Sequence, residues 1–358
     1  MPSSISNFDF QRPIPDLPWR RLALTAALLT LVAAVAWEIR CRAWGYAPVL
    51  NDTSDLWADW REKVQPTSTV IIGDSRALFD TDLDALEQGL GQRPVQLALV
   101  GSCAYPILEN LANDERFHGT VISSIIPLIW LAPPPSPPYQ NSLTALKRYQ
   151  KRTLAQRASH HLGMFLEEHI AFLKQEDLTL EQLLKHLPLP ARPGAGGPPL
   201  PPYFQATDRD RRTRMTESCA KPGPLQEHVK HTWLPLFTPP PPPSYVPPEA
   251  FGKAMGEAIE KRFTDTAAAV KKIQARGGKV VFVRFPMTGE LKKHEDKLTP
   301  RAGPWTRIIN ESGAAGIYFE DYPELAGFDC PEWSHLSAAD SVEFTKRLVP
   351  HLKKALAP

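Results

Sequence analysis

The feature that most constrains this chain is a run of 16 uncharged residues, Leu22 to Trp37, near its N-terminus. As a helix this run would be about 24 Å long, slightly shorter than the hydrocarbon core of a bilayer. Trp19 precedes it, and Trp44 and Tyr46 follow it, so aromatic side chains are available for both membrane interfaces. The sequence therefore predicts a transmembrane anchor over residues 22–39.

The charges that flank this run predict its orientation. Three basic residues precede it and two follow it: Arg12, Arg20 and Arg21 against Arg40 and Arg42, with Asp9 and Asp16 offsetting part of the first group. Because basic residues favour the cytoplasmic side, we expect residues 1–21 to be cytoplasmic. Residues 40–65 would then be a juxtamembrane linker, and the remaining chain would be extracytoplasmic, in the periplasm or at the cell surface.

Two other interpretations of the apolar run stay open. The tripeptide Ala34-Val35-Ala36 has the small-x-small form of a signal-peptidase site, which would make the run a cleaved signal. A run of 16 apolar residues also fits a buried helix of a soluble protein. The anchor and the cleaved signal both predict that the rest of the chain is exported.

From residue 69 onward, short apolar strands alternate with amphipathic helices. We expect strands at 69–72, 95–100, 121–130, 279–285 and 316–319, and helices at 83–90, 249–276 and 337–356. This alternation is typical of βαβ units around a parallel sheet. The sequence therefore predicts one α/β domain over residues 66–357.

A proline-rich insert, residues 133–248, interrupts this order. The chain has 38 prolines in 358 residues, and runs such as Pro133-Pro134-Pro135 and Pro239 to Pro243 lie at the two ends of the insert. Within it, 141–187 has a helical pattern and 188–224 resembles a loop. The proline runs are either polyproline II ligands for a partner protein or stiff loops that carry the insert across the sheet.

Composition excludes several classes of function. Lys and Arg number 41 against 39 Asp and Glu, a net charge of +2, so nucleic acid is not an expected partner. No glycine-rich phosphate loop is present, and His160-His161 and His294 lack companion metal ligands. We therefore expect neither a cofactor nor a metal.

The segment Gly73-Asp74-Ser75-Arg76 directly follows the first predicted strand and precedes a helical pattern. The carboxyl ends of parallel strands are where open α/β sheets bind ligands. A serine at a helix N-terminus lies where backbone N–H groups and the helix dipole favour negative charge. Ser75 is thus a candidate nucleophile; alternatively, it only caps the helix.

A second candidate element, Glu332-Trp333-Ser334-His335, lies just before the last predicted helix. A nucleophilic serine needs a base, and the base needs a carboxylate that holds its tautomer and orientation. His335 and Glu332 fit these two roles. The alternative is local hydrogen bonding by His335 and a solvated charge at Glu332.

Together these segments resemble the GDSL/SGNH hydrolase superfamily, whose motifs correspond here to Gly73-Asp74-Ser75, Gly101 and Glu332-Trp333-Ser334-His335. The resemblance covers residues 66–132 and 249–357 and implies a three-layer α/β/α sandwich. It implies that Ser75 is the nucleophile, His335 the base and then acid, and Glu332 the orienting carboxylate. The backbone N–H groups of Ser75 and Gly101 would form part of an oxyanion hole, and Asp74 would lie beside it.

Two positions depart from that family pattern. Glu332 stands where the family normally has Asp, so Asp329 is an alternative acid. The Asn that the family's third block supplies to the oxyanion hole is missing from Ile129-Trp130-Leu131-Ala132-Pro133.

Three further residues carry open predictions. Arg284 is a candidate for binding substrate, with a structural ion pair as the alternative. Cys103 and Cys330 would form a disulfide if both loops line one site, or else remain free buried thiols.

The resemblance is nearest to the membrane-anchored, exported branch of the superfamily, which includes O-acetyltransferases and esterases of cell-surface polysaccharides. The segment Val283-Arg284-Phe285-Pro286 is also similar to that branch. It implies an esterase or O-acyltransferase that acts on acetyl esters of cell-surface carbohydrate, with envelope proteins as possible partners. The alternatives are a non-catalytic binding or scaffolding subunit of a polysaccharide machine, and a helix-anchored adaptor that binds through its proline runs.

Overall fold

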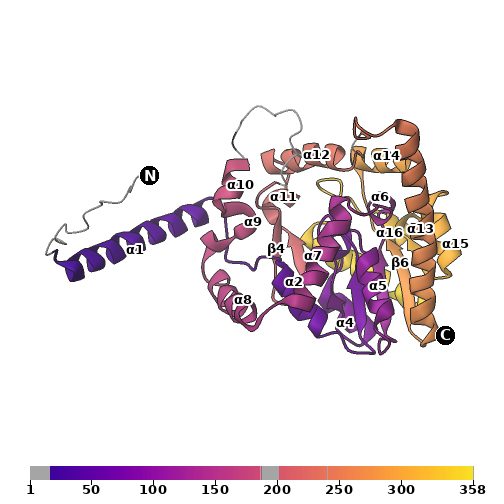
Figure 1. The fold of residues 1–358 in the computed structure, drawn as a ribbon, viewed down its shortest axis with the longest axis horizontal. Helices are drawn as coiled ribbons and strands as arrows, with labels where there is room; N and C mark the ends of the chain where they lie inside the picture. Colours follow the sequence, from indigo (N-terminus) through magenta and orange to yellow (C-terminus); the bar gives the residue numbers. More distant parts are fainter. Residues whose placement is uncertain (1–16, 186, 188–200, 240, 358) are drawn as a thin grey trace, which may run out of the picture.

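The computed structural model describes residues 17–185, 187, 201–239 and 241–357 (Figure 1). Its centre is a five-stranded parallel sheet with the strand order β2-β1-β3-β6-β7. The strands are β1 (Thr69–Ile72), β2 (Val95–Gln96), β3 (Thr120–Ser124), β6 (Lys279–Arg284) and β7 (Ala315–Tyr318). Their β-branched side chains are buried on both faces, as a parallel sheet requires. The predicted α/β class with a parallel sheet is confirmed.

The strand order reverses direction at β1. The chain passes from β1 to β2 on one side and returns to β3 on the other, so the two crossovers diverge between β1 and β3. Ile72 pairs with Ser123 at the carboxyl ends of these two strands. Such a switch point is where open α/β sheets bind ligands. Ser75, which follows β1 by three positions, lies at this point.

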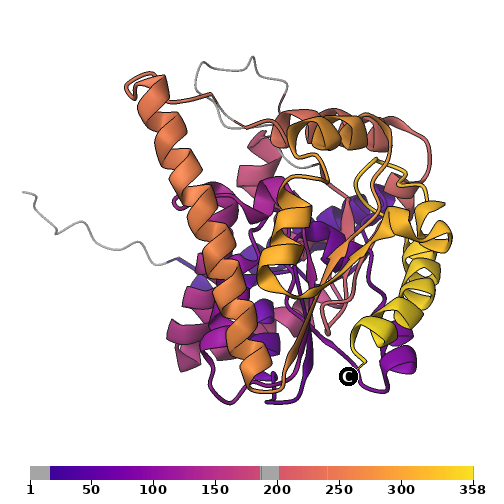
Figure 2. The same cartoon turned by 90° about the vertical axis from the view of Figure 1, so that its right-hand side faces the viewer.

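Helices cover both faces of the sheet (Figure 2). On one face α5 (Tyr105–Asn113) packs against the long α13 (Pro248–Ala275), and on the other α4 (Leu83–Leu90) packs against α17 (Ala338–Ala355). After the third strand, and outside the insert, the other helices are α6 (Pro127–Trp130), α14 (Gly289–Leu298), α15 (Pro304–Ser312), η2 (Phe319–Asp321) and α16 (Pro323–Ala326). Apolar residues at helical spacing explain the packing, since Phe344, Leu348 and Leu352 of α17 are fully buried.

Two predicted strands are shorter than expected. The second ends at Gln96 rather than at residue 100. The prediction of a strand over 121–130 is wrong beyond Ser124, because Pro127 begins α6. Proline has no N–H to donate to a sheet, whereas the first turn of a helix does not need that donor. The predicted helices at 83–90, 249–276 and 337–356 agree with α4, α13 and α17 to within one residue at each end.

The N-terminal helix α1 (Trp19–Ala43) is 25 residues long, and none of its most apolar 18-residue window is buried. At 1.5 Å per residue it spans about 37 Å, enough for a bilayer core. By length and composition it is the one helix among the described residues that qualifies as a membrane span. Its exposure shows that it is not a core helix of the body, from which it projects (Figure 1).

The segment after α1 is more ordered than the predicted linker over 40–65. It contains α2 (Ser54–Glu62), which packs against α7 (Pro137–Lys151). Trp57 of α2 is fully buried, and its indole N–H donates to the carbonyl of Leu97 at 2.9 Å. The segment is therefore part of the folded body.

The insert also contains more structure than predicted. Its helical part consists of α7, α8 (Leu154–Glu167), η1 (Ala171–Leu173), α9 (Gln175–Leu178) and α10 (Leu180–Lys185). The expected loop over 188–224 contains a hairpin of β4 (Gln205–Thr207) and β5 (Thr213–Met215), followed by α11 (Glu217–Ala220), and α12 (Pro224–Leu236) comes next. Residues 188–200 and 240 lie outside the described residues, so the proline-ligand interpretation stays a prediction.

Arg211 joins the insert to the sheet. Its side chain is fully buried and forms two 2.8 Å contacts with the carboxylate of Asp52. It also donates to the carbonyls of Gln96 at 2.8 Å and Ala98 at 2.9 Å, at the end of β2 and just after it. A buried guanidinium with this many partners holds the hairpin on the carboxyl edge of the sheet.

The turn between β1 and α3 (Ser75–Phe79) requires glycine at position 73. Gly73 has φ +152°, and a Cβ atom there would lie 2.6 Å from Ser124 Cβ and 2.7 Å from Ala77 Cβ. We expect Gly73→Ala to lower the free energy of unfolding by about 1–3 kcal/mol through overpacking, added to backbone strain. Urea denaturation of the full chain in detergent, followed by tryptophan fluorescence, measures this.

Gly91→Ala is the matched control, because Gly91 has φ +81° but no neighbouring atom within 4 Å of the place that an alanine methyl group would occupy. Gly91→Ala should lower the free energy of unfolding only through backbone strain, by about 1 kcal/mol. A Gly73→Ala variant as stable as Gly91→Ala would contradict the packing argument.

Candidate active site

Ser75 is the first residue of α3, and the helix cap is its neighbour. Asp74 adopts the extended conformation of an N-cap, and its Oδ1 accepts the backbone N–H of Arg76 at 2.9 Å. Its Oδ2 accepts the hydroxyl of Ser124, at the end of β3, at 3.0 Å. The interpretation of Ser75 as a simple cap is therefore wrong, and its half-buried hydroxyl is not used for capping.

Asp74 itself shapes the turn. It is only 3% exposed, and both carboxylate oxygens accept hydrogen bonds from within the protein. Burial raises the pKa of Asp74, although the charge of Arg76 and the hydrogen bonds oppose the rise. Its predicted role in the oxyanion and substrate-binding region is replaced by a structural role, because its carboxylate caps the helix that Ser75 begins.

Glu332 and His335 form a hydrogen-bonded pair. Nδ1 of His335 lies 3.0 Å from Oε1 of Glu332, and both side chains are fully buried. Oε1 also accepts the backbone N–H of His335, which aligns the carboxylate with the ring. Asp329 is exposed. Of the two candidate acids, the structure thus pairs Glu332 with His335.

Trp233 of α12 completes the surroundings of Glu332, and the sequence contained no sign of this. Its indole N–H donates to Oε2 of Glu332. The two residues are 99 positions apart, and no motif connects them. Only the path of the insert brings Trp233 to the carboxylate, so both carboxylate oxygens have partners in the dry interior.

The loop that carries His335 lies along α3. Arg76 Nε donates to Ser334 Oγ at 3.4 Å, and the N–H of Leu336 donates to Asp80 Oδ1 at 2.8 Å. The imidazole ring packs on Phe79, with ring centroids 4.7 Å apart. Phe79 ends the short helix that Ser75 begins, and residues four apart on a helix lie on the same face, so the His335 ring packs on the helix of Ser75.

The third link of a triad is not formed in this structure. His335 Nε2 is buried and has no hydrogen-bond partner among the described residues. The ring is enclosed by Phe204 and Trp233, with centroids 5.3 and 5.6 Å away, as well as by Phe79. The structure therefore brings His335 and Glu332 into contact, and it shows no hydrogen bond between His335 Nε2 and Ser75.

Gly101 lies at an exposed position after β2, on the same edge of the sheet. Its carbonyl accepts the side-chain amide of Asn141, from α7 of the insert, at 3.0 Å. The family pattern places its Asn directly after the third strand, whereas Asn141 follows that strand only after α6, within the insert. Its approach to Gly101 could be found only with the fold in hand.

Arg284 forms a buried ion pair. It is 3% exposed; its guanidinium donates to Glu295 Oε2 at 2.6 Å and to the carbonyl of Ile125 at 3.1 Å. Arg76 contacts both oxygens of the same Glu295 from the other side. The structural ion-pair interpretation of Arg284 is confirmed, and its predicted substrate-binding role is not supported, because its guanidinium is fully engaged.

The two arginines determine the ionisation of Glu295. Burial alone would raise its pKa, but the charges and hydrogen bonds of Arg76 and Arg284 lower the pKa to about 2. Asp80 is the opposite case: burial raises its pKa well above the usual value, and its Oδ2 has no partner in the described part of the chain. Burial thus shifts the pKa of Asp80 upward, while the two arginines shift that of Glu295 downward.

The cysteines do not form the predicted disulfide. All four are free and buried: Cys41, Cys103, Cys219 and Cys330. Cys103 Sγ lies 3.3 Å from the carbonyl of Trp130 and 3.0 Å from Arg262 Nη1, which hold it away from a bridge. The free-thiol interpretation holds in this structure.

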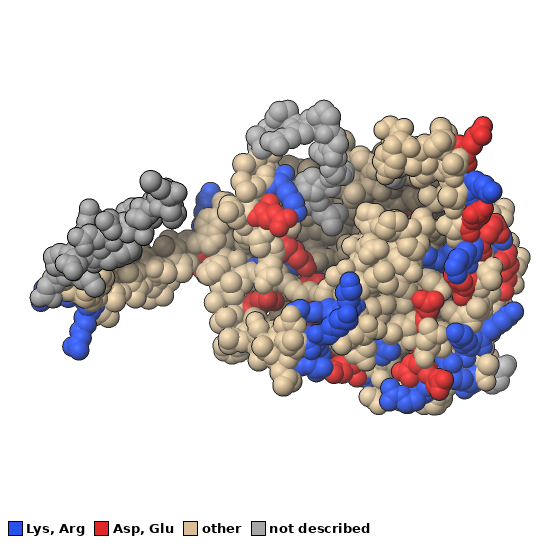
Figure 3. Space-filling model, viewed as in Figure 1, with Lys and Arg blue, Asp and Glu red and all other residues tan. Residues whose placement is uncertain are grey.

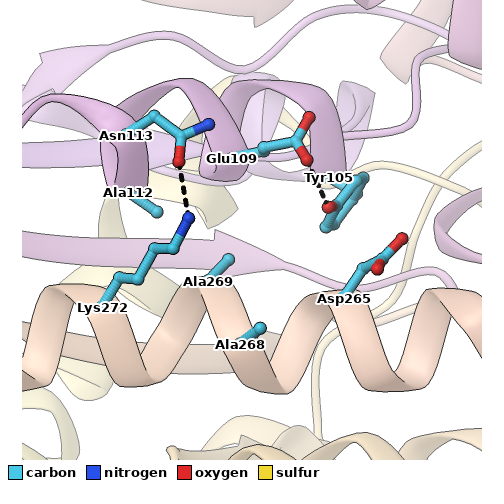
Figure 4. A pocket seen from close by; sticks show the side chains of 8 residues that line it. All are labelled: Tyr105, Glu109, Ala112, Asn113, Asp265, Ala268, Ala269 and Lys272. Carbon is cyan, nitrogen blue, oxygen red and sulfur yellow. Dashed lines mark hydrogen bonds between the residues drawn. The ribbon is translucent and has the colours of Figure 1, made fainter.

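Two hollows in the surface lie away from Ser75 and His335. One of about 140 Å³ separates α5 from α13 and is lined by residues such as Tyr105, Glu109 and Lys272 (Figure 4). Another, of about 160 Å³, lies beside α2 and contains Arg61 and Arg116. Neither includes Ser75 or His335. No cluster of three or more potential metal ligands occurs within the described ranges.

Comparisons with known proteins add no assignment: no protein-family model, no curated protein and no solved structure matches this chain.

The buried Glu295 yields a pH prediction. Its folded pKa of about 2 lies below the unfolded value of about 4.3, so the unfolded state binds more protons between these values. Its stabilising contribution is present above about pH 4.3 and is lost as the pH falls towards about 2. We expect Glu295→Gln to lower the free energy of unfolding at neutral pH by about 3–5 kcal/mol and to flatten the pH dependence in this window.

Glu290→Gln on the same helix is the matched control, since Glu290 is an exposed carboxylate paired with Lys293. Chemical denaturation between neutral and acidic pH should leave this control close to the wild type. Equal behaviour of the two variants would refute the role of Glu295.

Proposed function

We propose that this protein is a membrane-anchored, exported serine esterase or O-acyltransferase of the SGNH type. One observation carries the proposal: the Glu332–His335 pair, with a 3.0 Å hydrogen bond, packs through its imidazole on Phe79 of α3, the helix that Ser75 begins at the switch point of the sheet. The order of the three residues agrees with the resemblance to the GDSL/SGNH superfamily. So do their places, with Ser75 after the first strand and Glu332 and His335 before the last helix. The apolar helix α1 supports the membrane anchor.

The proposed chemistry begins with Ser75. Its Oγ attacks the carbonyl carbon of an acyl ester, while His335 Nε2 accepts the hydroxyl proton. Glu332 holds the proton on Nδ1, so Nε2 is the free acceptor. The tetrahedral oxyanion accepts hydrogen bonds from the backbone N–H groups of Ser75 and Gly101, each such donor being worth about 3–4 kcal/mol in related sites.

The intermediate then collapses. The bond between carbonyl carbon and alkoxy oxygen breaks, His335 returns its proton to the leaving alcohol, and the acyl group stays on Ser75 Oγ. In the second half, His335 deprotonates an acceptor hydroxyl that attacks the acyl-enzyme. The bond between the carbonyl carbon and Ser75 Oγ then breaks, and His335 returns the proton to Ser75 Oγ. Water as the acceptor gives an esterase, and a carbohydrate hydroxyl gives a transferase.

The proposed substrate is an acetyl ester of cell-surface carbohydrate. This follows from the resemblance to the exported branch of the superfamily and from the anchor. The enclosed His335 requires α12 or the segment around Phe204 to move before a substrate can enter. Closure of such a cover would exclude water from the acyl-enzyme, as acyl transfer to a sugar needs.

Replacement of the nucleophile tests the proposal directly. We expect Ser75→Ala to lower acetyl-ester turnover by about 10⁴-fold or more while the protein stays folded. Turnover is measured with the full chain in detergent on a chromogenic acetyl ester, with and without an oligosaccharide acceptor. Acceptor-dependent acetylated product identifies a transferase, and acceptor-independent hydrolysis an esterase.

Ser159→Ala, at an exposed serine of α8, is the matched control and should keep wild-type turnover. Wild-type activity in Ser75→Ala would contradict the proposed mechanism, in which Ser75 is the nucleophile.

Trp233 provides a second test. We expect Trp233→Phe to lower kcat, because Oε2 of Glu332 loses its indole donor and is left unpaired in the interior. The matched control is Trp305→Phe, which alters another buried tryptophan, packed on Tyr318, and should keep the wild-type kcat. A kcat of Trp233→Phe equal to that of the wild type would contradict a role of the indole donor.

A second candidate function, a non-catalytic binding or scaffolding subunit, is favoured by one observation. Within the described part of the chain, His335 Nε2 is buried without a partner, and the pair that His335 forms with Glu332 is fully enclosed. A fluorophosphonate probe distinguishes the two candidates. Labelling of wild type but not of Ser75→Ala supports the enzyme, and no labelling of well-folded wild type supports the binding subunit.

A further inference from the structure

The helix α8 exposes large apolar side chains, which a helix at a water-facing surface normally buries. Its largest outward side chains are apolar, with the exposed Ser159 and His161 at the edges of this face: Leu154 is 84% exposed, Leu162 62%, Phe165 57% and Leu166 38%. At 100° per residue these four positions lie within one third of the helix circumference. A surface helix of a soluble domain normally has the opposite arrangement, with its charged residues outward.

The polar side of α8 faces the protein. Arg157 makes two 2.8 Å contacts with Glu62 of α2, and His160 lies 3.3 Å from Asp59. Glu167 accepts the backbone N–H of Asn51 at 2.9 Å. The helix is therefore held by its charges, and its apolar side is left for another apolar medium.

The short helix α10 adds to this surface. Leu180 is 72% exposed, Leu184 53% and Leu183 37%, and Leu187 just after the helix is 49% exposed. We call the outward residues of the two helices the α8–α10 apolar surface: Leu154, Leu162, Phe165, Leu166, Leu180, Leu183, Leu184 and Leu187. Large exposed apolar patches, such as those of α8 and α10, mark contact with a protein or a membrane.

This surface is tied to the end of the anchor helix. Glu38 of α1 accepts the backbone N–H groups of Ala171 at 3.0 Å and Phe172 at 3.1 Å, in η1 between α8 and α10. Arg42 of α1 donates to the carbonyl of His169 at 3.1 Å. The α8–α10 apolar surface thus has a set position relative to α1.

That position is where a bilayer would be. Figure 1 shows α8 and α10 on the side of the body from which α1 projects, one on either side of its exit. Figure 3 shows most of the visible Lys, Arg, Asp and Glu on the right-hand and lower parts of the body, with a smaller group near the end of α1. A membrane crossed by α1 is the apolar medium continuous with this surface.

We propose that the α8–α10 apolar surface lies in the interface of the membrane that α1 spans, as a second, monotopic contact. Interfacial helices bury their apolar face about 5–10 Å into the boundary between headgroups and acyl chains. The contact holds the catalytic body against the bilayer instead of leaving it on a tether. The proposal rests on α1 as an anchor and is independent of whether Ser75 is catalytic.

Site-directed fluorescence tests the contact. Full-length protein carrying Leu162→Cys or Phe165→Cys is labelled with an environment-sensitive probe and reconstituted into vesicles of phosphatidylcholine and phosphatidylglycerol. The introduced thiol is labelled selectively because the four native cysteines are buried. Both substitutions are at exposed positions, so the fold is retained. Quenching is compared between lipids with brominated acyl chains and aqueous iodide.

Two further labels calibrate the result. Leu28→Cys, 61% exposed on α1, reports insertion of the anchor, and Lys253→Cys, 80% exposed on α13, reports the aqueous side. We expect the labels at 162 and 165 to lose fluorescence with brominated lipid and to be shielded from iodide, as at 28. The label at 253 should show the reverse.

Three results overturn the proposal. Labels at 162 and 165 that behave like the label at 253, while 28 is quenched by lipid, place the surface in water. Shielding of 162 and 165 from both quenchers indicates that a second copy of the chain covers it. A label at 28 that lipid does not quench would show that α1 is not inserted in the membrane, and the membrane contact proposed for this surface would then be wrong as well. None of these results bears on the Ser75 assay.

Discussion

The buried carboxylate of Glu295, held between the guanidinium groups of Arg76 and Arg284, connects the parts on which the candidate site depends. Arg76 belongs to α3, Glu295 to α14 and Arg284 to β6. A charge buried without partners would cost several kcal/mol, so these three elements can pack only in the arrangement that pairs them. The same Arg76 donates to Ser334, so the position of the His335 loop follows from this ion pair.

The insert is part of the site, although it interrupts the α/β order of the chain. Arg211 attaches its hairpin to the carboxyl edge of β2, Asn141 binds the Gly101 carbonyl, and Trp233 binds Glu332. These contacts also enclose the imidazole of His335. Access to the site and the environment of its acid are thus controlled by a segment outside the repeating strands and helices, and the α8 part of this segment faces the membrane in our proposal.

Most of the fold could be predicted because its signals are local. The β-branched run before Gly73, the apolar spacing of the helices at 83–90 and 338–355, and the uncharged run near the N-terminus each depend on neighbouring residues alone. The end of the third strand at Ser124 and the hairpin of the insert were not predicted. The first follows from Pro127, which begins a helical turn, whereas the hairpin depends on tertiary contacts such as those of Arg211.

By itself, the sequence determined the parallel α/β class, the apolar helix at the N-terminus, and Ser75, Glu332 and His335 as candidates, because strand and helix periods and short motifs are local properties. Only the tertiary structure decided which groups meet. It paired His335 with Glu332 rather than Asp329, gave Arg284 to an ion pair, left Cys103 and Cys330 as free thiols, and brought Trp233 to the carboxylate. Contacts between residues far apart in the chain depend on how elements pack and on which buried charges find partners, and no local pattern encodes that.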